Sequence, residues 1–424
     1  MRLIAIVLAA SLCAAAAPDG DEKQKVKAIK DFARQGSNGI VSISGYLNDR
    51  NSIVREEAVK AIVGIGGIQT LDPLVTATHD NDADVQQRAV DGLINFYLPG
   101  YVGKGWVDSV KHAGSSVAGM FGEQNDQVID PDTPVRPEIT QAVIRLVGGG
   151  ASDDARAGAA RAAGILRARA AVPALCDALK SRSDGLMYES LIALQKIRDA
   201  SGGPCAVYLV KDLNEKVQLA AIDLVGLLRT TDAVPDLKRV VESGNKKARR
   251  AALSALGQIA DPSSLPYFEK YLNDKDDGMR ASAAEGIGRV GVPADKTLIQ
   301  GLFQNERKTS LKLSLAFALA GLGDVDEAVD GPLRYLSSNL TSRSWKGVAT
   351  PFLAELARKP QVRAVIHQLL GSLGDKDELM GLANVLAISG GKDSLPALQQ
   401  LSRSNDAEVA KEAIRAIRLI NSRN

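Results

Sequence analysis

A repeat of 31 residues is the feature that most constrains the fold of this chain. Prolines recur at that interval, and each one opens an apolar segment; the series is Pro173, Pro204, Pro235 and Pro266. Proline suits the first turn of a helix, because its missing N–H would have no partner inside the helix there. The spacing therefore predicts a series of helices that begin at equivalent positions of successive units.

A second pattern lies between the prolines and predicts a second helix in each unit. It begins with Asp or Asn, continues with an apolar anchor that is often followed by Arg, and ends in an Ala-rich stretch. Asp and Asn are good N-caps, and the apolar residues that follow recur at helical intervals. The anchors are Val54, Val85, Met187, Val217, Ala248, Met279 and Ser310.

Glycine recurs late in these second helices. The positions are Gly64, Gly164, Gly226, Gly257, Gly288 and Gly321. A glycine inside a helix costs about 1 kcal/mol relative to alanine. We therefore expect the missing side chain to have a use, which is to let neighbouring helices come close.

These patterns resemble HEAT repeats of the short bacterial type named for phycobilisome lyases. The pattern D-x-x-V-R-x-x-A-x-x-A-L-G is matched best at 51–66, 245–257 and 276–288. The resemblance implies an all-α, right-handed α-solenoid of two-helix repeats, in which stacked neighbours supply the core. We expect a single array over residues 17–424 without a conventional domain boundary, and a diverged repeat at 336–372.

The segment 96–138 departs from the repeat and holds five of the 17 aromatic residues. The anchors Val85 and Ala155 are 70 residues apart, so two periods would leave about eight inserted residues. One interpretation is a diverged repeat with a long turn. The other is a partner-binding feature, since aromatic side chains concentrate in binding hot spots. The candidate residues for binding are Tyr97, Tyr101, Trp106 and Phe121.

Arginine recurs one residue after several anchors, as at Arg55, Arg156, Arg249 and Arg280. A basic stripe for an anionic partner is one interpretation. A structural ladder of Asp–Arg pairs between adjacent turns, as in HEAT repeats generally, is the favoured one. Arg249, Arg250 and Arg280 remain candidates for a partner-binding patch.

Cys176 and Cys205 lie in first helices of adjacent units. Cys205 is offset by two residues from the position equivalent to Cys176, which is about 200° around a helix. Such an offset lets two side chains on parallel helices face each other, so a disulfide is sterically allowed. Two buried thiols are the alternative, because Cys176 also falls on an apolar stripe.

Residues 1–16 have the features of a secretory signal peptide: a positive start, an apolar run at 3–12 and small residues around Ala16. We expect export to the periplasm or the extracellular space. Lipidation at Cys13 is the alternative, which Leu12 disfavours because bacterial lipoprotein signals carry a small residue there. The apolar run is shorter than the ~20 residues of a bilayer span, and we expect no membrane insertion.

Composition and motifs argue against several classes of function. Lys and Arg number 52 and Asp and Glu 50, so net charge provides no reason to bind nucleic acid. Three histidines and three cysteines are too sparse for common metal-site spacings. Some relatives of this repeat type, such as deoxyhypusine hydroxylase, hold iron with His-Glu pairs, and this sequence has none. We expect no cofactor and no catalysis.

The sequence therefore predicts an exported, non-catalytic scaffold that binds another protein. The exposed sides of the second helices and the aromatic segment would form its binding surface. One alternative is an enzyme or enzyme accessory that resembles phycobilin lyases, and the other is an envelope structural protein that self-associates.

Overall fold

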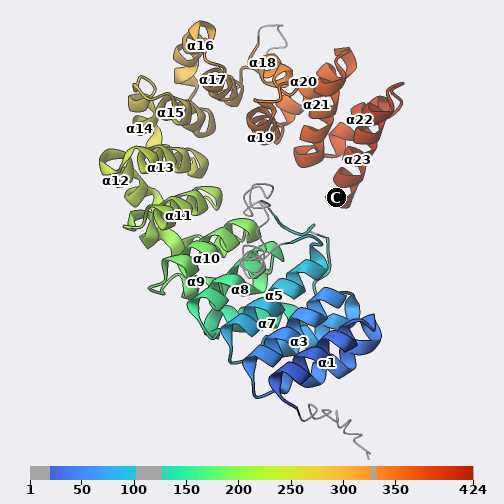
Figure 1. Cartoon of the computed structure of the whole chain (residues 1–424). Helices are drawn as coiled ribbons and strands as arrows, with labels where there is room; N and C mark the ends of the chain where they lie inside the picture. Colours follow the sequence, from blue (N-terminus) through green and yellow to red (C-terminus); the bar gives the residue numbers. More distant parts are fainter. Residues whose placement is uncertain (1–19, 102–126, 131, 326–330, 424) are drawn as a thin grey trace, which may run out of the picture. The chain divides into compact units, whose positions relative to one another are not determined.

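The computed structural model describes residues 20–101, 127–130, 132–325 and 331–423 (Figure 1). The signal-peptide prediction at 1–16 lies outside this range. The described residues form helices and turns, and no strand occurs among them. The chain divides into two compact units, Met1–Leu224 and Val225–Asn424, here called the first and second units. Each is described by itself, and a single uninterrupted array stays a prediction.

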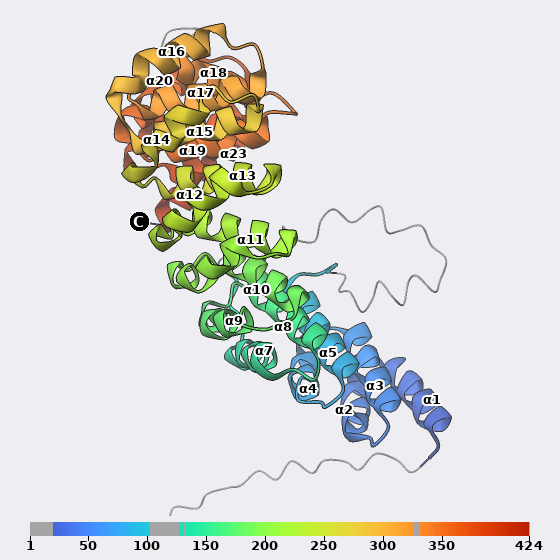
Figure 2. The ribbon, with the colours of Figure 1, turned by 90° about the vertical axis from the view of Figure 1, so that its left-hand side faces the viewer.

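The first unit consists of helix pairs. Its helices are α1 (Glu22–Ala33), α2 (Ile40–Ser44), α3 (Ser52–Ile65), α4 (Leu71–Ala77), α5 (Ala83–Tyr97), α7 (Pro137–Gly149), α8 (Asp153–Ile165), α9 (Val172–Ala178), α10 (Asp184–Ile197) and α11 (Glu215–Leu227), which crosses the boundary. A 3-10 helix, η8 (Pro204–Lys211), stands where the first helix of the last pair is expected. The first helices α2, α4, α7 and α9 form one layer, and the second helices α3, α5, α8 and α10 form the other (Figure 2).

The second unit continues the pattern. Its helices are α12 (Val234–Ser243), α13 (Lys246–Ile259), α14 (Leu265–Tyr271), α15 (Asp277–Val290), α16 (Lys296–Asn305), α17 (Thr309–Gly321), α18 (Pro332–Ser338), α19 (Lys346–Leu356), α20 (Pro360–Ser372), α21 (Lys376–Ser389), α22 (Leu395–Leu401) and α23 (Ala407–Arg423). Its second helices pack in series from α13 through α15, α17, α19 and α21 to α23. Both units are therefore α-solenoids of two-helix repeats, which confirms the predicted fold class.

The N-caps set the register of the second helices. The side chains of Asn51, Asp82, Asn245 and Asp276 accept hydrogen bonds from backbone N–H groups of the first turn. The residue three positions after each cap is the buried anchor. This register corrects two expected anchors. The cap at Ser183 makes Leu186 the anchor in place of Met187, and in α17 the buried Leu311 replaces the exposed Ser310.

The late glycines do allow close helix approach. A Cβ on Gly164 would lie 2.7 Å from the Cα of Ala193, and a Cβ on Gly288 would lie 2.6 Å from the Cα of Ala318. Gly64 is the exception, since nothing lies within 4 Å of its Cβ position. There the contact between α3 and α5 is made by Gly92 instead, whose Cβ would lie 2.5 Å from a methyl carbon of Val63.

The segment between α5 and α7 is an insertion between neighbouring repeats. Helix α5 packs directly against α8, so the second helices continue across this segment without a repeat between them. The 70-residue spacing of Val85 and Ala155 is one period plus about 39 residues. The insertion is thus much longer than the expected eight residues, because anchor spacing alone cannot separate one long insertion from an added repeat. In the second unit, by contrast, α19 does pack between α17 and α21.

Candidate functional site

Buried charged side chains meet on the second helices of the first unit. Arg161 of α8 donates two hydrogen bonds to the carboxylate of Glu189 of α10, one of them from Nε to Oε2 at 3.1 Å. Asp91 of α5 is buried beside this pair and interacts electrostatically with Arg161. Asp91 and Arg161 occupy the same repeat position, since each lies nine residues after its N-cap. We call Asp91, Arg161, Glu189 and Tyr101 the buried cluster.

Tyr101, at the start of the insertion, is buried beside the other three residues of this cluster. It is 6% exposed, and its hydroxyl interacts electrostatically with Asp91, Arg161 and Glu189. Within the described part of the chain, no hydrogen bond of normal geometry reaches the Tyr101 hydroxyl or Oδ2 of Asp91.

The surroundings shift the pKa values of both residues. Burial raises the pKa of Asp91 to about 7, although the charges of Arg161 and Arg88 oppose the shift. Burial, together with the nearby Asp91, raises the pKa of Tyr101 to about 12. Asp91 therefore changes its charge near neutral pH, while Tyr101 stays protonated.

The insertion is fastened to the helices at both ends. At its start, Tyr101 is buried, and the Tyr97 hydroxyl accepts a hydrogen bond from the backbone N–H of Arg136 at 3.1 Å. Near its end, the N–H of Ile129 donates to the carbonyl of Ile165, the last residue of α8, at 3.0 Å. The described ends of the insertion thus lie against the second helices α5 and α8.

The predicted aromatic residues divide into three cases. The ring of Tyr97 packs edge-to-face against Phe96 with 5.0 Å between centroids. Tyr101 is buried, which leaves it little surface to offer a partner. Trp106 and Phe121 lie outside the described residues. Asp91, Arg161 and Glu189 were not predicted from the sequence. Each is a charged residue in the middle of an apolar or Ala-rich second helix, and this pattern could have identified them.

The predicted arginine patch lies in the second unit, where each member has a partner inside the chain. Arg249 donates from Nε to the carbonyl of Val241 at 2.9 Å. Arg250 pairs with Asp276 in the next repeat, at 2.6 Å between Nε and Oδ1. Arg280 donates to the carbonyl of Asp274 at 2.9 Å and pairs with Asp277, the first residue of its own helix. These contacts favour the structural interpretation, and a binding role for the three arginines stays a prediction.

The Asp–Arg ladder is present, but its members vary from repeat to repeat. Arg55 pairs with Asp80 of the following repeat, at 2.6 Å between Nε and Oδ2. In the second unit Arg250, rather than Arg249, makes the equivalent link. The guanidinium of Arg250 holds the pKa of Asp276 well below its usual range.

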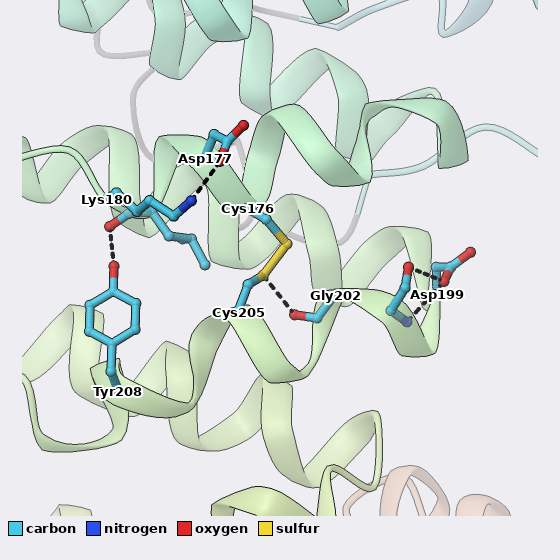
Figure 3. The surroundings of a disulfide bond; sticks show 9 residues. Cys176, Asp177, Lys180, Asp199, Gly202, Cys205 and Tyr208 are labelled. Atoms are coloured by element: carbon cyan, nitrogen blue, oxygen red, sulfur yellow. Dashed lines mark hydrogen bonds and ion pairs between the residues drawn. A yellow bond between two sulfur atoms is a disulfide. The ribbon is translucent and has the colours of Figure 1, made fainter.

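Cys176 and Cys205 form a disulfide, one of the two alternatives that the sequence left open (Figure 3). The sulfur atoms are 2.10 Å apart and the Cα atoms 5.6 Å apart. The bond links α9 to η8, so it joins the first helices of two adjacent repeats. Nearby, the hydroxyl of Tyr208 donates to the carbonyl of Leu179 across the same pair of repeats.

The described residues contain no group of three or more His, Cys, Asp and Glu side chains that could hold a metal ion. None of the helices in the described ranges is both long and apolar enough to cross a bilayer.

Comparison with known proteins identifies the repeat. Residues 204–288 and 239–320 match the family of HEAT repeats. No curated protein matches the chain. Similar solved structures include an engineered protein with 18% identity and a TM-score of 0.35, which aligns over 90% of this chain and 98% of its own.

Two natural proteins are also among the similar structures. The complex of CpcE and CpcF of phycocyanin lyase from Nostoc sp. PCC7120 has 18% identity and a TM-score of 0.35, over 64% of this chain and 94% of its own. YibA of E. coli has 13% identity and a TM-score of 0.42, over 72% of this chain and 98% of its own. At such low identities and TM-scores these likenesses support no statement about function.

Proposed function

Because this chain carries HEAT repeats, we propose that it is an exported, non-catalytic scaffold that binds another protein through the insertion between α5 and α7. The observation that carries this proposal is the attachment of the insertion. Its described ends are held against the second helices by Tyr101 and by the backbone of Ile129. Attachment at both ends fixes where the insertion leaves and rejoins the second helices.

The buried cluster supports a role in display rather than in catalysis. Arg161 and Glu189 are 7% and 8% exposed, and they satisfy each other. Groups so enclosed have little access to a substrate, but they can hold the described start of the insertion in a fixed position. Preorganisation of a binding segment reduces the entropy lost when a partner binds.

The disulfide supports the exported part of the proposal. Disulfides persist in oxidising compartments such as the bacterial periplasm and are rare in the cytosol. The signal-peptide pattern at residues 1–16 points to the same compartment. Cell fractionation of the full-length chain tests this part: we expect mature protein in the periplasmic or extracellular fraction, and its retention in the cytosol with an uncleaved N-terminus would contradict export.

The binding proposal is tested by replacing residues 102–126 with a Gly/Ser linker of equal length, which keeps both attachment points. The tagged wild-type and linker chains would be cross-linked in an envelope fraction, and the captured proteins compared by mass spectrometry. We expect a partner that only the wild type captures, and loss of the same partner from Trp106→Ala. The matched control is Arg249→Gln with Arg250→Gln, which should keep the partner. Capture by the linker chain would show that the insertion is not the binding element.

A further inference from the structure

A basic pocket lies in the second unit, at the C-terminal ends of its second helices. Its volume is about 200 Å³, and the residues that line it include four with a cationic side chain and one with a carboxylate. The charged residues are Arg229, Arg289, Glu355, Arg358 and Lys359. The late glycines Gly288 and Gly321 line it as well, so the close approach of the helices helps to shape it.

Arg289, which lines the pocket, already binds a carboxylate of the chain itself. Arg289 donates from Nε and Nη2 to the two carboxylate oxygens of Glu355, at 2.9 and 3.0 Å. The guanidinium carbon lies 4.7 Å from the ring centroid of Phe317, which holds the group in place. A fork-to-fork pair of this kind is the geometry by which arginine recognises planar carboxylates. The chain therefore supplies its own example of the ligand chemistry that this pocket favours.

The other three cationic residues of the pocket differ in whether their side chains bind another group of the chain. Lys359 donates from Nζ to the carbonyl of Gly321 at 2.6 Å, which offsets the negative end of a helix dipole. Arg229 and Arg358 are exposed, and none of the contacts among the described residues engages either guanidinium. Glu285, behind Arg289, adds a carboxylate whose pKa is raised by burial. The pocket keeps an excess of positive charge.

The backbone at Arg229 adds a second observation. Its φ is 52°, a left-handed conformation that glycine adopts more readily than arginine. The equivalent positions in the next two repeats are Ala260 and Gly291. The equivalent positions in the two preceding repeats are Arg167 and Arg198, so this turn accepts arginine without requiring it.

We propose that this pocket binds the carboxylate side chains of an acidic segment in a partner protein, with Arg229 and Arg358 as the donors. Charge complementarity selects such a segment, since the pocket offers two unengaged planar donors beside one that already binds a carboxylate. The residues of this pocket belong to the second unit and the insertion belongs to the first, and different variants test the two proposals.

The test uses a fluorescein-labelled hexaglutamate peptide and fluorescence anisotropy with the full mature chain. The variant Arg229→Gln with Arg358→Gln should bind about tenfold more weakly, as expected for the loss of two charge-assisted donors. Arg167→Gln with Arg198→Gln is the matched control, because these exposed arginines have the same left-handed conformation in the first unit. It should change the affinity less than about twofold.

Three outcomes would overturn the proposal. They are equal losses in the two variants, an unchanged affinity in Arg229→Gln with Arg358→Gln, and binding of inorganic phosphate without any binding of hexaglutamate. Circular dichroism of each variant confirms that the helices are intact. Replacement of residues 102–126 should leave hexaglutamate binding unchanged, which separates this test from that of the proposed function.

Discussion

The first and second units contain the same chemical pair in different surroundings. Arg161 and Glu189 join consecutive second helices, α8 and α10, and are buried together with Tyr101. Arg289 and Glu355 join α15 and α19, which are two repeats apart, and border an open pocket. The difference lies in what covers the pair. A covered pair can anchor another segment of the chain, whereas an open pair beside unengaged arginines can meet an external ligand.

The largest expected effect comes from Glu189→Ala. It would leave Arg161 buried and without its carboxylate, which typically costs about 3–5 kcal/mol. Hydrogen exchange with mass spectrometry is the measurement, because repeat proteins need not unfold in two states. We expect faster exchange in α8 and α10 and unchanged exchange in α21. A variant as protected as the wild type would show that the pair does not stabilise the first unit.

Asp91 should make the stability of the first unit depend on pH. Its pKa is about 7 in the folded chain and close to 3.8 in the unfolded chain, so the folded state binds the extra proton between these values. The contribution of Asp91 to stability should therefore be fully present below about pH 4, be lost as pH rises towards 7, and not change further above it. The slope is at most about 1.36 kcal/mol per pH unit.

Asp91→Asn removes the titrating group and should flatten this dependence. Local exchange rates at pH 5 and pH 8, corrected for intrinsic exchange, are the comparison. If wild type and variant lose protection equally between these pH values, Asp91 is not the group responsible.

Glu355→Ala should have a smaller effect than Glu189→Ala. Glu355 is 29% exposed in its side chain, and Arg289 keeps a second carboxylate, since its Nη1 lies 3.4 Å from Oε2 of Glu285. We expect a loss of about 1–2 kcal/mol in the stability of the second unit, measured as local exchange in α15 and α19. An effect as large as that of Glu189→Ala would remove the distinction between a covered and an open pair.

The smallest effect is expected from Tyr101→Phe. Among the described residues the hydroxyl has no hydrogen bond of normal geometry, so its removal should change stability by less than about 1 kcal/mol. Tyr101→Ala is the contrasting variant, because it also removes the buried ring. Clear destabilisation by Tyr101→Phe would show that the interaction of the hydroxyl with Arg161 stabilises the folded chain.

Much of the fold could be predicted because the repeat is recorded in local patterns. Caps such as Asn245 and Asp276 act within one helical turn, and the anchors follow at a constant distance. Where the expected cap was the wrong residue, as before Leu186, the predicted anchor was one residue too late in the chain. The insertion shows the limit of this reasoning, since the spacing from Val85 to Ala155 fits two arrangements and only the packing of α5 against α8 separates them.

The site was harder to predict, because its residues are distant in the chain. Sequence reasoning located the insertion and singled out Tyr101 as a residue that binds a partner. In the structure the side chain of Tyr101 is buried. Sequence reasoning also singled out Arg249 and Arg250 for their local density of charge, and in the structure they have partners inside the chain. Local charge density does not reveal which carboxylates lie within reach.

By itself the sequence determined the helix pairs, most of their caps, their apolar faces and most of the glycines at which helices approach, because these depend on neighbours along the chain or on an exact period. Only the tertiary structure decided that Arg161 meets Glu189, that Arg289 reaches Glu355 across two repeats, and that Cys176 and Cys205 are joined. The physical reason is that such contacts depend on how far each repeat rotates against the next. That rotation is the sum of many packing contacts, and no single residue encodes it.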